Sequence, residues 1–382
     1  MRIAIDYTPA VNQHAGIGRY VRGLVDALAT VDTSNEYILF YAYRDKSNPP
    51  KIAALNNPSF RERAIPIPDR VLTILWYRLG VPLPIDILTG QVDVFHSLDF
   101  VLPSVRRGVS VLTVHDLSFL LFPECADDGL RSYLEKAVPR SVARADLITA
   151  DSINTKNDLV CLLDAPPDSV GVVYGGVDDK FVPLDDDWKA LAAARQKYGI
   201  DFPFILSVGV IEPRKNFSRL ISAYALLKER SNFAHKLVIV GRKGWLYHEV
   251  FRKVSELGLE GHVLFLGYVP DIDLPALYNL ADVFAFPSLY EGFGFPVLEA
   301  MACGTPVVSS DRSSLPEIVG QAGLMVPPDD VEAIAAALEQ VLADSQLRDN
   351  LVRQGFERAS LFTWRKAAER IVETYRKAAQ GR

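Results

Sequence analysis

Residues 282–317 read DVFAFPSLYEGFGFPVLEAMACGTPVVSSDRSSLPE, and this stretch decides the fold. It begins with the apolar run 283–286, which is bounded by Pro287 and is typical of a buried strand. A second apolar run at 307–308 predicts another strand. A glycine-rich loop and a segment long enough for a helix lie between the two runs. The order strand, loop, helix, strand predicts an α/β domain.

The loop between these strands predicts an anion-binding site. Pro296 stands where proline is favoured as the first residue of a helix, and the helix can continue to Cys303 before Gly304 ends it. A helix start leaves N–H groups unpaired and carries partial positive charge, while glycines let a ligand approach the backbone. This combination suits a phosphate or a diphosphate. The loop residues expected to contact it are Gly292, Phe293, Gly294, Phe295 and Pro296.

Two carboxylates frame the loop, Glu291 before it and Glu299 in the first turn of the expected helix. An ionised carboxylate only accepts hydrogen bonds, so it repels phosphate and suits the two O–H donors of a vicinal diol. A nucleotide sugar fits this pattern, with Glu299 on the ribose and Glu291 on the hexose. The competing interpretation is that Glu299 complements the helix dipole and that Glu291 is a solvated loop residue.

The run EGFGFPVLEAMACGTPVV at 291–308 resembles the E-x7-E motif of the family-four glycosyltransferases. The resemblance implies a retaining, metal-independent enzyme of the GT-B fold, with two Rossmann-like, doubly wound α/β domains facing a central cleft. An acceptor-side domain is then expected at 1–184, completed by a C-terminal helix at 364–382. The nucleotide-sugar-binding domain is expected at 185–363.

The composition agrees with a two-domain enzyme. A chain of 382 residues is too long for one ordinary core, and a net charge of −6 argues against a dedicated nucleic-acid binder. No apolar run has the length to span a bilayer and the N-terminus lacks a signal-peptide pattern, so a cytoplasmic protein is expected. The three scattered cysteines suggest neither a disulfide framework nor a zinc site.

The first half of the chain begins with a strand expected at 2–6. Gly16 and Gly18 follow in a predicted loop before an apolar-periodic helix, and a glycine loop at this place contacts ligands in open α/β sheets. The dinucleotide fingerprint is incomplete because Val21 stands at its third glycine, so NAD binding is not indicated. A plain turn is the alternative, while the resemblance implies that Gly16 and Gly18 face the diphosphate and the acceptor.

His115 and Asp116 follow the strand expected at 109–114. Ligands of parallel sheets bind beyond the carboxyl ends of strands, and histidine can donate to a sugar hydroxyl or share a developing charge. A structural hydrogen bond at the strand end is the alternative. The resemblance implies that His115 approaches the donor sugar, with Asp116 orienting it. Other strands of this half are expected at 37–43, 92–96, 147–150 and 170–174.

Residues 61–88 mix prolines, apolar residues, aromatic residues and arginines. The segment could lie on a membrane surface or line an acceptor groove, so contact with the inner face of a membrane stays open. Ordinary packing of an amphipathic segment is favoured over both. The polar and aromatic residues concerned are Arg61, Arg63, Arg70, Trp76, Tyr77 and Arg78.

The second half repeats the strand, loop, helix layout. A strand expected at 204–208 is followed by Gly209 and then by the adjacent cations Arg214 and Lys215, just before a helix. Cations are unfavourable at a helix start unless an anion binds there, and these two suit a diphosphate. The resemblance implies that they neutralise the leaving nucleoside diphosphate. Val210 replaces an arginine found in some members, which removes one cation from the expected site.

Two more strands are expected at 237–241 and 263–267, each ending in glycine. Gly241 is expected beside the donor, and the resemblance implies that the nucleotide base rests near Val269. The sequence Asp271-Ile272-Asp273 has the spacing of a metal-binding D-x-D motif, but capping of the following helix is the favoured interpretation.

Together these residues predict transfer of a hexose from a nucleoside diphosphate to a hydroxyl acceptor, with no metal or other cofactor. The segments IEPRKN and LYEGFGFP resemble the corresponding sequences of mannosyltransferases of surface-polysaccharide assembly. GDP-mannose is therefore the favoured donor and UDP-glucose the second, with a glycan or lipid-linked acceptor. A sugar-nucleotide epimerase, a phosphorylase and a non-catalytic nucleotide-sugar-binding protein are the alternatives.

Overall fold

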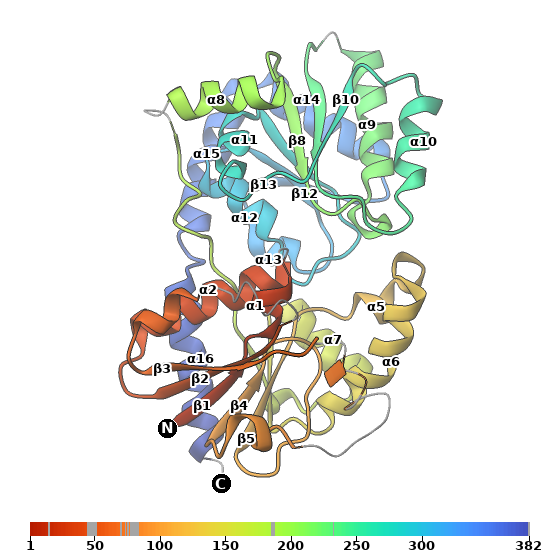
Figure 1. The fold of residues 1–382 in the computed structure, drawn as a ribbon. Helices are drawn as coiled ribbons and strands as arrows, with labels where there is room; N and C mark the ends of the chain where they lie inside the picture. The colour runs from red at the N-terminus through yellow and green to blue at the C-terminus, as the bar shows by residue number, and fades with distance from the viewer. Residues whose placement is uncertain are drawn as a thin grey trace. The chain divides into compact units, whose positions relative to one another are not determined.

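The computed structural model describes residues 1–13, 16–43, 52–68, 71–72, 74, 76, 84–184, 188–231 and 233–380. The chain forms two compact units (Figure 1). Unit 1 comprises Met1–Leu121, Asp128–Gly176 and Thr363–Arg382, and unit 2 comprises Phe122–Asp127 and Val177–Phe362. The main change of unit therefore lies between residues 176 and 177, eight residues before the expected boundary at 184–185, and Phe122–Asp127 from the first half belongs to unit 2.

Unit 1 is built on a parallel sheet of seven strands in the order β3-β2-β1-β4-β5-β6-β7. The strand order reverses direction at β1 and β4, which is the arrangement of a doubly wound fold. The strands are β1 (Arg2–Asp6), β2 (Glu36–Ala42), β3 (Phe60–Ile65), β4 (Val94–Ser97), β5 (Val109–Val114), β6 (Leu147–Ala150) and β7 (Val170–Val172).

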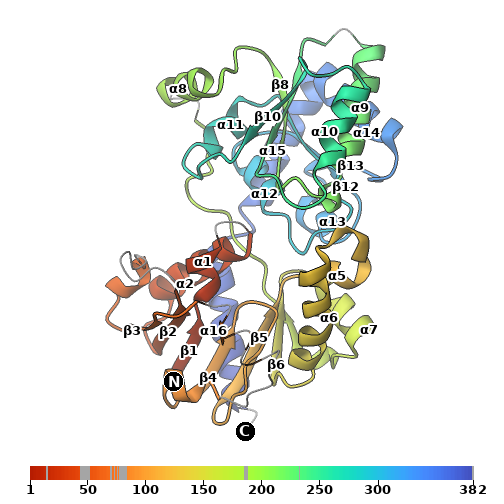
Figure 2. The same ribbon diagram turned by 45° about the vertical axis from the view of Figure 1, so that its right-hand side comes forward.

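The helices of unit 1 cover this sheet, and α2 and α16 lie side by side although they come from opposite ends of the chain (Figure 2). The helices are α1 (Thr8–Asn12), α2 (Gly16–Val31), α4 (Asp86–Thr89), α5 (Ser118–Leu121), α6 (Asp128–Val142), α7 (Ile153–Leu163) and α16 (Trp364–Gln380). Short 3-10 turns occur at Ala53–Asn56 and Pro167–Ser169.

Unit 2 has a parallel sheet of six strands in the order β10-β9-β8-β11-β12-β13. Its strands are β8 (Phe204–Val208), β9 (Lys236–Val240), β10 (Val263–Gly267), β11 (Val283–Phe286), β12 (Val307–Ser310) and β13 (Gly323–Val326). Its helices are α8 (Trp188–Tyr198), α9 (Phe217–Arg230), α10 (His248–Glu256), α11 (Leu274–Leu280), α12 (Phe295–Ala302), α13 (Leu315–Val319), α14 (Val331–Ala343) and α15 (Ser345–Ala359), with 3-10 turns at Pro123–Cys125 and Pro213–Lys215.

The prediction of two Rossmann-like α/β domains is confirmed. Each unit has its own apolar core between its sheet and helices, so each satisfies the burial requirement of an independent domain. The central strands are apolar along their whole length because helices cover both faces of a parallel sheet. For this reason the short runs at β5 and β11 were recognisable in the sequence, and both were predicted with the correct bounds.

Strand β3 was missed by the sequence analysis, which treated residues 61–88 as one amphipathic segment. It is the edge strand of unit 1, and three charged residues, Arg61, Glu62 and Arg63, are exposed in its middle. An edge strand needs no continuous apolar run, so its sequence resembles a surface segment. Of the other residues considered for a membrane or acceptor contact, Arg70, Tyr77 and Arg78 lie outside the described residues.

Helix α16 is held against the sheet of unit 1 by a buried polar contact. The Tyr375 hydroxyl lies 2.7 Å from Nδ1 of His96 on β4, and Nε2 of His96 lies 2.8 Å from the Thr113 hydroxyl on β5. Burial lowers the pKa of His96 to about 3, so the ring is neutral at physiological pH. The last helix of the chain is thus part of the core of unit 1.

The predicted glycine loop at Gly16 and Gly18 is the first turn of α2, which corrects the sequence-based interpretation. A short helix, α1, precedes it and was not predicted. An ideal Cβ at position 18 would lie 1.9 Å from the Gln13 carbonyl oxygen, whereas one at position 16 meets nothing within 4 Å. Gly18 therefore permits α1 and α2 to approach each other, which explains the glycine without a ligand.

No helix in the described part of the chain combines the length and apolar character required to cross a bilayer.

Gly18→Ala is expected to destabilise unit 1 by roughly 1–3 kcal/mol, because the added methyl group overlaps a backbone atom that cannot move without shifting α1. Gly16→Ala is the matched control on the same helix turn and should be neutral or slightly stabilising, because alanine favours helices. Urea unfolding of the two variants measures the difference. Equal midpoints for both variants would contradict the close-approach explanation.

Candidate active site

The candidate site of unit 2 lies at the carboxyl edge of its sheet. Strands β8 and β11 are parallel neighbours, so the loops that follow them emerge at the same edge. The loop after β8 carries Arg214 and Lys215, and the loop after β11 carries Glu291. The fold thus brings Glu291 next to Arg214 and Lys215, from which it is separated by 77 and 76 residues along the sequence.

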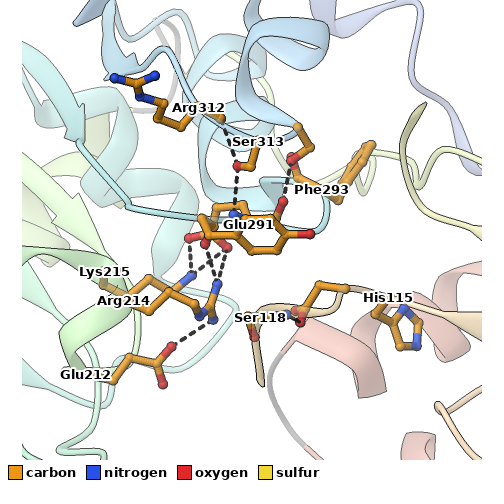
Figure 3. A network of polar contacts seen from close by, with 12 residues as sticks. His115, Ser118, Glu212, Arg214, Lys215, Glu291, Phe293, Arg312 and Ser313 are labelled. Carbon is orange, nitrogen blue, oxygen red and sulfur yellow. Dashed lines mark hydrogen bonds and ion pairs between the residues drawn. The ribbon is translucent and has the colours of Figure 1, made fainter. Parts of the chain in front are cut away.

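Glu291 is paired with both cations (Figure 3). Its carboxylate oxygens lie 2.7 Å and 2.9 Å from Lys215 Nζ, and Oε2 lies 3.0 Å from Arg214 Nη1. The ammonium group of Lys215 also lies over the Phe286 ring, 5.1 Å from its centroid. Burial would raise the pKa of Glu291, but the charges of Lys215 and Arg214 outweigh it and hold that pKa at about 2. The carboxylate is therefore ionised.

Arg214 is held from several sides. Its Nη1 also donates to the Tyr290 carbonyl at 2.7 Å, and its Nη2 donates to Glu212 at 2.7 Å. Its own carbonyl accepts from Leu289 N–H at 2.9 Å. The two loops are consequently joined by backbone and side-chain contacts, and the guanidinium has a defined orientation (Figure 3).

Ser313 and Ser314 hold the backbone of the glycine loop. The Glu291 N–H donates to Ser313 Oγ at 2.8 Å. The Ser314 hydroxyl contacts the carbonyl oxygens of Glu291 and Phe293, at 2.9 Å and 2.8 Å. Both serines precede α13, so a third segment fixes the position of the loop (Figure 3).

The start of α12 differs in detail from the expected anion site. The helix begins at Phe295, and Gly294 before it has φ +116°, which favours glycine. The N–H groups of Val297 and Leu298 already donate to the Gly294 carbonyl. Pro296 has no N–H, so fewer donors remain for a ligand than a bare helix start would offer.

Glu299 lies in the second turn of α12 because the helix starts one residue earlier than predicted. The carboxylate is buried at 1% relative exposure, and Oε2 accepts a hydrogen bond from the Tyr278 hydroxyl at 2.9 Å. Complementation of the helix dipole stays the alternative for Glu299. The ribose contact stays a prediction.

Other predicted donor-contacting residues also lie at this edge. Gly209 follows β8 and packs on the aliphatic part of Lys215. Gly241 follows β9 with φ +153°, and a Cβ there would lie 1.8 Å from the Gly209 carbonyl oxygen. Val269 follows β10 and is buried, beside the exposed Tyr268. The loops after β8 and β9 therefore pack closely together, and Gly241 permits the approach.

Asp273 does not cap α11 with its side chain, contrary to the expectation. Its carboxylate accepts hydrogen bonds from Lys197 Nζ and the Tyr198 hydroxyl, both at 2.6 Å. Asp271 lies 4.0 Å from Lys180. Within the described ranges, no three His, Cys, Asp or Glu side chains gather in the manner of a metal site.

The candidate residue of unit 1, His115, follows β5 and is 5% exposed. Its Nδ1 lies 2.7 Å from Asp151 Oδ2, and its Nε2 lies 2.9 Å from the Leu98 carbonyl oxygen. Asp116, expected to orient the ring, instead accepts from the Ser118 N–H. The carboxylate that orients His115 is therefore Asp151, at the end of the neighbouring strand β6.

The environment of His115 favours the imidazolium form. Burial lowers its pKa, but the charge of Asp151 and the hydrogen bond to it outweigh burial and raise the pKa to about 9. Asp99 adds to the increase. Both ring nitrogens act as donors in this form, one to a carboxylate and one to a carbonyl.

Sequence reasoning missed Asp151 and Glu212. Asp151 lies where α7 begins, and Ser152 next to it caps that helix by accepting from the Thr155 N–H. The signal for Asp151 was its place after a strand adjacent to β5. Glu212 lies two residues before Arg214 in the polar segment IEPRKN, whose composition suggests a surface loop. Its burial follows from the packing of this loop at the edge of the sheet, which the sequence does not reveal.

Two family models match the chain. The model described as Glycosyltransferase Family 4 matches residues 14–181, and the model described as Glycosyl transferases group 1 matches residues 192–358. Between them the two models cover most of both halves of the chain.

Relatives and solved structures agree with these matches. The chain is 34% identical to the O-antigen chain mannosyltransferase B of Escherichia coli, over 98% of this chain and 100% of that protein. Its fold is similar to a sucrose-phosphate synthase from Thermosynechococcus elongatus, with a TM-score of 0.77 and 23% identity over 100% of both chains. It is also similar to Anabaena HepE in complex with UDP and glucose, with a TM-score of 0.74 and 20% identity over 99% of this chain and 100% of that one.

Asp151→Asn is expected to lower the pKa of His115, because it removes the charge and the charged hydrogen-bond partner that oppose the effect of burial. In the wild type, the raised pKa contributes stability that is fully present below the unfolded-state value and is lost as the pH rises through about 9. NMR titration of the ring and urea unfolding across this pH window measure both effects. Asp116→Asn is the matched control, and an unchanged His115 pKa in Asp151→Asn would contradict the assignment.

Proposed function

The chain belongs to the family 4 glycosyltransferases of the GT-B fold, and from this premise we propose that it is a retaining, metal-independent mannosyltransferase. The proposed donor is GDP-mannose, and the proposed acceptor is a hydroxyl of a glycan or a lipid-linked glycan in surface-polysaccharide synthesis. The chain is an enzyme that transfers a hexosyl group. The finer points of donor, acceptor and stereochemistry are the proposal.

The observation that carries the proposal is the pair Arg214 and Lys215 at the carboxyl edge of unit 2. A phosphate that leaves with the electrons of a glycosidic bond gains negative charge, and cations fixed beforehand stabilise that charge most in the transition state. Arg214 presents an oriented guanidinium because Glu212 and the Tyr290 carbonyl hold it. We assign these two cations to the diphosphate of the donor.

Glu291 is assigned to the hexose and Glu299 to the ribose. Glu291 precedes the glycine loop and Glu299 lies in the helix that follows it. Ser313 and Ser314 hold the backbone of Glu291 in place. Glu299 is buried and already accepts a hydrogen bond from the Tyr278 hydroxyl. The ribose role requires that its carboxylate also accepts hydrogen bonds from the two ribose hydroxyls. The loop Gly292–Pro296 and the residues Gly209, Gly241 and Val269 complete the proposed donor-contacting surface of unit 2.

His115, a residue of unit 1, is assigned to the donor sugar. Because both ring nitrogens already donate to protein oxygens, we propose that it acts by its positive charge and that Asp151 sustains that charge. No side chain is assigned as a nucleophile. The leaving phosphate is proposed to accept the proton of the acceptor hydroxyl, which is compatible with retention of configuration.

Mannose is favoured because a relative that matches along nearly the whole chain is a mannosyltransferase. UDP-glucose is the second candidate, since the similar fold of HepE was solved with UDP and glucose. That likeness concerns the fold alone, so it does not favour the second donor over the first. Contact with the inner face of a membrane, where a lipid-linked acceptor would reside, is part of the proposal.

Metal independence is proposed because the positive charge at the diphosphate would come from Arg214 and Lys215. The D-x-D sequence is an unsuitable alternative, since Asp273 is engaged by Lys197 and Tyr198 and Asp271 lies near Lys180.

A thermal-shift screen with GDP-mannose, GDP, UDP-glucose and UDP is expected to show the largest stabilisation with the GDP pair, because a ligand that binds only the folded state raises the unfolding midpoint. Turnover of GDP-mannose with a lipid-linked glycan should persist in EDTA. A larger shift with the UDP pair would replace the proposed donor, and loss of activity in EDTA would contradict metal independence.

Replacing Arg214 and Lys215 by alanine is expected to lower kcat by roughly 10²–10³ with a smaller effect on donor affinity, because fixed charges act most on the developing phosphate charge. Arg252→Ala is the matched control, since Arg252 is an exposed arginine on α10 whose Nε lies 3.5 Å from Glu256. Steady-state kinetics measure the split between kcat and KM. Full turnover in the double variant would remove the leaving-group assignment.

A further inference from the structure

The carboxylate of Glu291 occupies the hydrogen-bonding positions that an anion would use. It contacts Lys215 Nζ with both oxygens and Arg214 Nη1 with one. These nitrogens are the donors that the proposed function assigns to the diphosphate. A diphosphate that takes these same hydrogen-bonding positions displaces the Glu291 carboxylate.

The charges of the cluster are balanced. Arg214 and Lys215 carry two positive charges, and Glu212 and Glu291 carry two negative charges, all four with side chains at most 17% exposed. An arriving diphosphate therefore meets a neutral cluster instead of a cationic one. Glu212 accepts from Nη2 of Arg214, whereas Glu291 accepts from Nη1, so Glu212 can keep its contact while Glu291 moves.

The geometry confines the movement to the side chain of Glu291. Its N–H is bonded to Ser313 and its carbonyl to Ser314, and neither contact involves the carboxylate. Rotation about the side-chain bonds can thus release both cations while the backbone of the loop stays in place (Figure 3).

We propose that Glu291 competes with the diphosphate for Arg214 and Lys215, and that this competition makes the site prefer a nucleotide sugar to the spent nucleoside diphosphate. The inference rests on the proposed function. A buried carboxylate that leaves its cations requires other hydrogen-bond donors. The hydroxyls of the hexose supply them, whereas a bare nucleoside diphosphate has no hexose and its ribose hydroxyls are assigned to Glu299.

Substrate and product therefore both have to overcome the free-energy cost of separating Glu291 from its cations. Only the substrate offsets this cost, because its hexose hydroxyls can donate to the displaced carboxylate. After the hexose has been transferred, the carboxylate loses its new partners and returns to the cations. The returning carboxylate favours dissociation of the nucleoside diphosphate, so one residue serves sugar recognition and product release.

Glu291→Gln tests this inference by isothermal titration calorimetry with GDP and GDP-mannose, and with UDP and UDP-glucose. The amide cannot pair with the cations as an anion does, so the nucleoside diphosphate should bind at least about tenfold more tightly than to the wild type. The nucleotide sugar loses its carboxylate partner and should gain less. The ratio of the two affinities should therefore move toward the nucleoside diphosphate.

Glu212→Gln is the matched control. It removes the same charge from the same cluster, but its carboxylate contacts one cation from the side away from Glu291. Both ligands should then gain equally, with an unchanged ratio. An unchanged ratio in Glu291→Gln would overturn the inference, because the effect would be one of net charge alone.

If circular dichroism shows that Glu291→Gln does not fold, a second variant tests the same inference. Glu291→Asp keeps the charge but is one methylene shorter, so it cannot reach both cations as Glu291 does, and the ratio should move in the same direction. An unchanged ratio there would also overturn the inference. If the wild type binds neither nucleotide pair, the proposed donors fail and the inference fails with them; binding with unchanged ratios removes the inference alone.

Discussion

The pairing of Glu291 with Arg214 and Lys215 is the interaction on which the edge of unit 2 depends. Each charged group would be costly to bury alone, and the three are tolerated because each has a partner within 3.0 Å. The loops after β8 and β11 must therefore keep fixed positions relative to each other. The Leu289 to Arg214 backbone contact and the two serines before α13 do this.

Unit 1 contains a similar arrangement made of different residues. His115 and Asp151 form a buried ion pair at the carboxyl ends of two neighbouring parallel strands, β5 and β6. Buried pairs are weak contributors to stability, so their recurrence at the ligand-binding edge of both sheets favours a functional explanation.

Much of the fold was predictable because buried parallel strands are short apolar runs and their helices have a clear period. The errors have a shared cause. Strand β3 is an edge strand with a charged face, and the turn at Gly16 and Gly18 became helical because α1 ends against it. Neither an edge position nor a close approach between segments leaves a periodic signal in the sequence.

The sequence by itself determined the order of the central strands, the Glu291 and Glu299 spacing, and the cation pair before α9. Only the tertiary structure decided which groups these side chains contact: Asp151 for His115, Tyr278 for Glu299, and Lys197 with Tyr198 for Asp273. The physical reason is that adjacent residues of an extended chain point in opposite directions, while parallel strands far apart in sequence end at one edge. A pattern along the chain identifies the residues at that edge, and the packing of the loops selects their partners.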